Sequence, residues 1–255
     1  QRGGILPALA TVLVIGTFVL VPVTLMFGGW QDMTGAAYGF SALSGLCYVF
    51  GCIGLYQAFA IGPVRLVAPI MGSYPILSIG WSAVQGQPVS VDQWLAVGAV
   101  VAGVAIVSTL SSEQSSTGSR ANAIGWAIMG AVGFAGTFAV GHIATQAGAE
   151  LPVVLTTRVV TAAVVVSILL MSKGATWPER AAWPLLGLMA VFDAFALGIV
   201  IASGGLDRPE FAAVAASTFG MVTIILAWGF LKERMTSAQW GGVILSFAGI
   251  GYLAL

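Results

Sequence analysis

Apolar runs long enough to cross a membrane, separated by short polar breaks, constrain the fold of this chain more than any other feature. A helix of about 20 apolar residues spans the ~30 Å hydrocarbon core of a bilayer. The sequence holds nine such runs, at 5–27, 37–61, 63–86, 92–110, 122–147, 151–172, 182–205, 209–231 and 237–255. It therefore predicts an all-α integral membrane protein with the lipid bilayer as its surroundings.

Composition supports this prediction and excludes other classes of protein. Hydrophobic residues make up 58% of the chain and charged residues 7%, whereas about a quarter of the residues of a soluble domain are charged. The formal net charge is zero, so the basic footprint of a nucleic-acid-binding protein is absent from the sequence and we expect no nucleic-acid partner. Cys47 and Cys52 share one apolar run and are interpreted as small buried hydrophobic residues.

A Gln-Trp pair followed by an apolar run with glycine occurs twice, and the two copies lie 146 residues apart. This offset aligns Ser90 with Thr236, Gln93 with Gln239, Trp94 with Trp240, Val97 with Val243, Ala102 with Ala248 and Gly103 with Gly249. Near the start of each copy an offset of 145 pairs Leu6-Pro7 with Leu151-Pro152. The repeat is too long for a solenoid unit, whereas duplicated halves of several membrane helices are typical of transporters.

The duplication predicts a first repeat at 1–110, a polar linker at 111–121 and a second repeat at 122–255. The second repeat holds five predicted helices and the first holds four, so the helix at 122–147 has no counterpart. Because the chain also begins with Gln1 instead of Met, we expect that the first helix of the first repeat is missing and that the parent protein is an inverted 5+5 helix repeat. Such repeats place a substrate site near the bilayer midplane.

Several short motifs carry a resemblance to a known family. They are Gly62-Pro63-Val64, Val67-Ala68-Pro69-Ile70, Tyr74-Pro75 and the turn Lys232-Glu233-Arg234-Met235-Thr236 before the second Gln-Trp pair. With them the chain resembles the EamA family of the drug/metabolite transporter superfamily over both halves. The first half departs from the family turn, because Gln87-Pro88 stands where Glu-Arg is usual.

The resemblance implies ten helices in two inverted repeats. It also implies export or exchange of small metabolites or drugs across a prokaryotic inner membrane, without ATP, by a multi-pass protein whose two ends are cytoplasmic. The charges point the other way. Arg2, Arg65, Arg120, Lys173, Arg180, Lys232 and Arg234 fall on one side of the predicted helices, with Arg208 alone on the other. The positive-inside rule makes the first side cytoplasmic, so the orientation stays open between the two.

Asp193 is the sharpest functional candidate, because an ionisable group inside a membrane helix is costly and marks function by default. It lies near the centre of the run at 182–205. Desolvation disfavours its charged form unless a cation lies nearby, which would suit it to bind and release a proton during transport. The alternative is a neutral or hydrogen-bonded aspartate that serves helix packing.

Arg158 and His142 are the other ionisable side chains well inside predicted helices. Arg158 could hold an anionic substrate group with two hydrogen bonds, or it could bond helix-end carbonyls or extend toward the membrane surface. His142 could titrate near neutral pH, or it could be a solvated or packing residue.

A polar and aromatic set on the middle helices of the first half completes the candidates for the substrate pathway. Its members are Tyr48, Tyr56, Gln57, Ser73 and Tyr74. In the family that the chain resembles, these helices line the central cavity, where tyrosine and glutamine side chains can orient a small ligand. The alternative is ordinary packing.

We conclude from the sequence that the chain is a secondary transporter of a small-molecule substrate, an exporter or exchanger that works by alternating access. Proton coupling through Asp193 is the expected driving force, and facilitated exchange, which needs no ionisable group, is the alternative. His142 is the single histidine and no phosphate-binding lysine motif occurs, so we expect no metal and no cofactor. The oligomeric state is open between monomer and homodimer. The rival interpretations are a membrane-embedded enzyme, which would need a nucleophile or paired carboxylates, and a scaffold with a fully packed interior.

Overall fold

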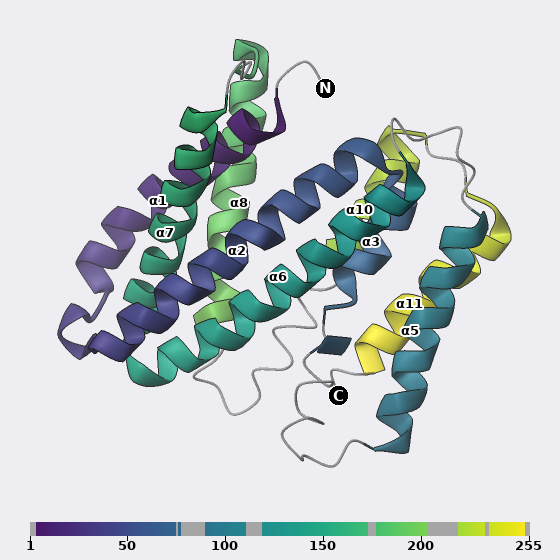
Figure 1. Cartoon of the computed structure of the whole chain (residues 1–255), viewed down its shortest axis with the longest axis horizontal. Coiled ribbons are helices and arrows are strands. Elements are labelled where there is room, and N and C mark those ends of the chain that lie inside the picture. Colours follow the sequence, from purple (N-terminus) through teal and green to yellow (C-terminus); the bar gives the residue numbers. More distant parts are fainter. Residues whose placement is uncertain are drawn as a thin grey trace. The chain divides into compact units, whose positions relative to one another are not determined.

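The computed structural model describes residues 4–74, 76–77, 90–110, 119–172, 177–202, 219–232 and 235–252. Throughout these ranges the regular structure is helical (Figure 1). The α-helices are α1 (Ile5–Phe27), α2 (Gly35–Ile61), α3 (Val64–Gly72), α5 (Val91–Leu110), α6 (Arg120–Ala147), α7 (Glu150–Met171), α8 (Trp183–Ala202), α10 (Phe219–Phe230) and α11 (Ser237–Tyr252). Each falls within or close to one of the nine predicted runs, which confirms the prediction of an all-α protein.

Five helical stretches in the described part of the chain are long and apolar enough to cross a membrane. They are α1, α2, α6, α7 and the segment Arg180–Ala202, in which the short 3-10 helix η3 (Arg180–Ala182) leads into α8. The protein is therefore a multi-pass membrane protein. The second part of the predicted helix at 63–86 and the first part of the helix at 209–231 lie outside the described residues.

The chain forms two compact units, and each unit takes segments from both predicted repeats. Unit 1 comprises residues 1–56 and 136–209, and unit 2 comprises residues 57–135 and 210–255. The long helices α2 and α6 contribute to both units. The repeat boundaries at 110 and 122 thus describe how the sequence is duplicated and not which residues pack together, and they stay a prediction.

In unit 1, α2 packs against α7 through threonine hydroxyls. Thr157 donates to the carbonyl oxygen of Ser41 (3.2 Å), and Thr161 donates to the carbonyl oxygen of Gly45 (2.9 Å). A Cβ atom on Gly45 would lie 2.6 Å from the Thr157 carbonyl oxygen. The absence of a side chain at Gly45 therefore lets the two helices approach closely, as in many membrane helix pairs.

The contact between α1 and α8 in the same unit repeats this arrangement with apolar residues. Val12, Leu186 and Ala190 share a buried cluster, and Gly16 lies against the carbonyl oxygen of Ala190. Each of these four positions lies 145 residues from its counterpart in the α2–α7 contact. The offset found in the sequence thus also relates two helix contacts within unit 1.

In unit 2, α5 and α11 lie side by side (Figure 1) and meet through small residues. A Cβ atom on Gly103 would meet the Gly242 carbonyl and Ser246, and a Cβ atom on Gly249 would lie 2.7 Å from the Ala96 carbonyl oxygen. Ala96 and Gly103 lie 146 residues before Gly242 and Gly249, so the two contacts are equivalent under the second offset.

The same capping arrangement begins both of these helices. The backbone N–H of Ser90 donates to Gln93 Oε1 (2.9 Å), and the N–H of Gln93 donates to Ser90 Oγ (3.2 Å). Thr236 and Gln239 exchange the same two bonds at the same distances. These capping boxes satisfy N–H groups that a helix start leaves unpaired. Gln239 Nε2 also donates to the carbonyl of Leu110, at the end of α5 (3.1 Å).

Candidate functional site

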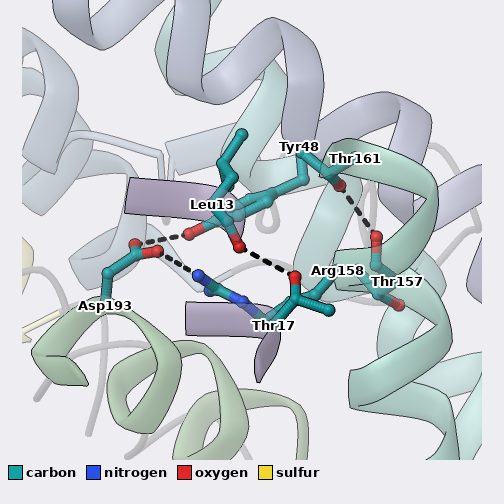
Figure 2. A network of polar contacts seen from close by, with 7 residues as sticks. All are labelled: Leu13, Thr17, Tyr48, Thr157, Arg158, Thr161 and Asp193. Carbon is teal, nitrogen blue, oxygen red and sulfur yellow. Dashed lines mark hydrogen bonds and ion pairs between the residues drawn. The ribbon is translucent and has the colours of Figure 1, made fainter. Parts of the chain in front are cut away.

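Three helices of unit 1 bring Asp193, Arg158 and Tyr48 together, as Figure 2 shows. Arg158 Nη2 on α7 lies 2.8 Å from Asp193 Oδ2 on α8 and forms an ion pair with it. The Tyr48 hydroxyl on α2 donates to the other carboxylate oxygen, Oδ1, at 2.7 Å. The carboxylate is therefore held by one charged and one neutral donor, and all three residues lie within segments that span the membrane.

Burial differs sharply across this cluster. The Arg158 side chain is completely buried and Tyr48 is nearly so, whereas the Asp193 side chain keeps 33% of its surface exposed. Two further donors of Arg158, Nε and Nη1, are buried without a hydrogen-bond partner among the described residues. Of the two charged groups, the carboxylate is thus the more exposed one.

Gly16 on α1 makes room for the guanidinium group. A Cβ atom at this position would meet Arg158 Nη2, would lie 3.1 Å from Arg158 Cζ and would lie 2.9 Å from the Ala190 carbonyl oxygen. The next residue along α1, Thr17, donates its hydroxyl to the carbonyl oxygen of Leu13 (2.8 Å) and so satisfies it within the helix. The surface of α1 therefore leaves space for the guanidinium group at Gly16, where another residue would carry a side chain.

The ion pair bears on the prediction for Asp193. The sequence argument for a proton carrier rests on desolvation, with a nearby cation as its exception, and the structure places such a cation at 2.8 Å. An unpaired charge at this depth would be costly, whereas paired charges are the usual arrangement of buried ionisable groups. Asp193 is therefore a paired carboxylate and not a solitary one.

His142 lies apart from this cluster. Its Nε2 atom is 3.1 Å from the carbonyl oxygen of Val200, in the last turn of α8. The contact links α6 to the end of α8. The histidine is thus suited to a capping role, and its function in transport stays a prediction.

The polar and aromatic set divides between the two units. Tyr48 belongs to the cluster with Asp193, and Tyr56 is the last residue of this segment of unit 1. Gln57 begins unit 2, where Ser73 bonds the Ile70 carbonyl at the end of α3 (2.7 Å) and Tyr74 is buried. The substrate roles of these residues stay predictions.

The pairing of Arg158 with Asp193 was missed by the sequence analysis, which treated them separately. Two signals were available. Isolated charges of opposite sign on consecutive membrane helices tend to pair, and Tyr48 lies 145 residues before Asp193, so their contact joins positions that the repeat makes equivalent. Gly16 gave no signal of its own, because the chain contains 34 glycines.

Charged side chains inside membrane-spanning helices often lie on the paths of substrates, ions or protons, so fold and site together are typical of a membrane transport protein. The chain belongs to the EamA-like transporter family, a member of the drug/metabolite transporter superfamily, whose model matches residues 2–109 and 121–255.

A solved structure titled "Crystal structure of protein" shares the fold, with a TM-score of 0.68 and 16% sequence identity, over 96% of this chain and 86% of that one. No curated protein matches the sequence significantly.

Proposed function

We propose that this protein is a secondary transporter that exports or exchanges small metabolites or drugs across a prokaryotic inner membrane by alternating access, and that Asp193 couples this transport to proton movement. The observation that carries the proposal is the partly exposed carboxylate of Asp193, held by a fully buried arginine in the middle of a membrane helix. Membership of the EamA-like transporter family supports it.

The energy of the ion pair explains how proton binding would drive a conformational change. Removal of one partner of a buried ion pair costs about 3–5 kcal/mol, because the other charge is left without compensation. A proton that neutralises Asp193 in place would impose this cost on Arg158. Proton binding is therefore favourable only if Arg158 gains other partners at the same time. Its Nε and Nη1 atoms, which have no hydrogen-bond partner among the described residues, could donate to such partners. Such linkage between protonation and a change of contacts is what coupling requires.

The test is solute and proton flux in liposomes that contain the purified protein. The solute panel holds amino acids, nucleosides and organic cations such as tetraphenylphosphonium. We expect at least one solute to drive proton flux in the wild type, and Asp193→Asn to reduce that flux at least about tenfold, because an amide cannot exchange the proton.

The matched control is Asp32→Asn. Asp32 is exposed in the short 3-10 helix η1 (Trp30–Asp32) at the end of α1, so the same chemical change there should leave flux within about twofold of the wild type. Solute flux without proton movement in both proteins would contradict the coupling and indicate a uniporter or exchanger. Failure to transport any solute of the panel would favour the enzyme and scaffold interpretations.

A further inference from the structure

We propose that Arg158 acts as a positioning residue, which sets the charge and orientation of Asp193 from a socket provided by Gly16 and does not itself touch the transported solute. The inference deepens the proposed function, because it assigns the two sides of the ion pair to different tasks. Asp193 meets the solute or the proton, and Arg158 works only through it.

Access to solvent separates the two charges. Arg158 has no exposed side-chain surface, whereas a third of the Asp193 side chain is exposed. A solute in contact with Asp193 would therefore meet its carboxylate, while the counter-ion, Arg158, stays buried in the protein. A group with no exposed surface has no face to offer a solute, however well a guanidinium suits an anion.

Gly16 is the residue that allows the arginine to occupy this place. Any side chain on Gly16 would overlap Arg158 Nη2 and approach the Ala190 carbonyl. The gap is therefore filled by the guanidinium group itself. The socket holds Nη2 against Asp193 Oδ2, and the Tyr48 hydroxyl fixes the other oxygen.

The 145-residue offset relates the α1–α8 contact to the α2–α7 contact, and of these two the socket exists in the α1–α8 contact. The positions 145 residues from Arg158 and Gly16 are Leu13 and Thr161. Thr161 bonds the Gly45 carbonyl across the α2–α7 contact, while the equivalent Gly16 leaves the corresponding space in the α1–α8 contact open to the guanidinium. The α1–α8 and α2–α7 contacts thus differ at the position where the ion pair forms. Gly16 occupies this position beside Arg158, whereas Thr161 occupies the equivalent position in the other contact.

The titratable side chains near Asp193 are the other groups that could influence its charge. The titratable side chains close enough to interact with it are Arg158 on α7 and Tyr48, Cys52 and Tyr56 on α2. On α6, His142 is engaged with Val200, two turns further along α8. Arg158 is the one permanent cation in this set.

The first test is a thermal-unfolding cycle that does not depend on transport. Arg158→Met and Asp193→Asn should each lower Tm by about 5 °C or more, because each leaves the other member of the ion pair without its partner. The double variant should recover at least half of that loss. Additive losses would overturn the inference, since they would mean that the two side chains act independently.

Gly16→Ala tests the socket in the same assay. It should lower Tm markedly in the wild-type background and by less than half as much beside Arg158→Met, where the guanidinium that it displaces is gone. Gly187→Ala on α8 is the matched control, because a Cβ atom there has no neighbour within 4 Å in the described part of the chain, and it should leave Tm unchanged or higher. An equal loss from Gly16→Ala in both backgrounds would overturn the assignment of the socket.

The second test measures transport of the panel solute that the wild type moves fastest. Arg158→Met should lower kcat for transport at least about tenfold, because Asp193 loses the group that positions it. KM for the solute should change less than about twofold, and Arg158→Lys should restore kcat in part. A tenfold rise in KM with an unchanged kcat would show direct contact with the solute and overturn the inference. If the wild type moves no solute, the proposed function fails, and the unfolding cycle still decides whether Arg158 serves Asp193.

Discussion

At the scale of single residues, the ionisable side chains inside the membrane helices have distinct environments. Asp193 and Arg158 neutralise each other across two helices, whereas His142 bonds a backbone carbonyl near a helix end. Position in the sequence gives the depth of such residues in the membrane. Their partners depend on which helices face each other, and this is a property of the packed unit.

The contact of His142 with the Val200 carbonyl leads to a prediction about stability. His142→Leu should lower the free energy of unfolding by about 1 kcal/mol, because it removes one hydrogen bond that links α6 to the last turn of α8. The expected fall in Tm is about 2–4 °C, with transport retained within about twofold. Ser167→Ala is the control, since the Ser167 hydroxyl bonds the carbonyl of Ala163 within α7. Abolished transport at an unchanged Tm would instead place His142 in the substrate pathway.

At the scale of helices, close approach is decided by where small residues fall on a helix surface. Gly103 and Gly98 lie on the same helix, α5, and have opposite surroundings. A side chain on Gly103 would meet α11, whereas Gly98 has open space beside it. The sequence shows the abundance of glycine, but only the packed helices show which glycines have a partner.

The two glycines provide a matched pair of substitutions. Gly103→Ala should destabilise the protein by about 1–3 kcal/mol, because the α5–α11 contact must open to admit a methyl group. Gly98→Ala should be neutral or stabilising by up to about 1 kcal/mol, because alanine favours the helix. Thermal unfolding in detergent measures both. Equal effects of the two substitutions would contradict the packing of α5 on α11.

At the scale of the whole molecule, the helix order predicts which breaks share a side of the membrane. Asp32, after α1, and Arg180, before α8, lie in breaks separated by an odd number of membrane crossings (α2, the run at 63–86, α5, α6 and α7). We therefore expect them on opposite sides. Substitution with cysteine at either position, in a protein with Cys47→Ala and Cys52→Ala, should give labelling by an impermeant maleimide from one side only, and from different sides for the two. Labelling from the same side would contradict the helix count. The side that labels Arg180→Cys also decides between the orientation from charge and that from the family.

The candidate site was predicted in part. Asp193, Arg158 and Tyr48 were each selected from the sequence, because charged and polar groups are conspicuous in apolar runs. Their contact was not predicted, because it depends on which face each of the helices α2, α7 and α8 turns toward the others, and the sequence does not give this orientation. Gly16 and the threonine hydroxyls of α7 were not selected, because small and weakly polar residues are common in membrane helices and their value depends on the neighbour they meet.

The sequence by itself determined the class of fold and the family, because bilayer thickness converts apolar length directly into membrane helices and the motifs match along nearly the whole chain. The tertiary structure decided how these helices combine. It divides the chain into two units that each take segments from both predicted repeats, and it pairs Arg158 with Asp193 in a gap left by Gly16. The physical reason is that hydropathy acts on each helix alone, whereas ion pairing and close packing act between helices that are distant in the chain.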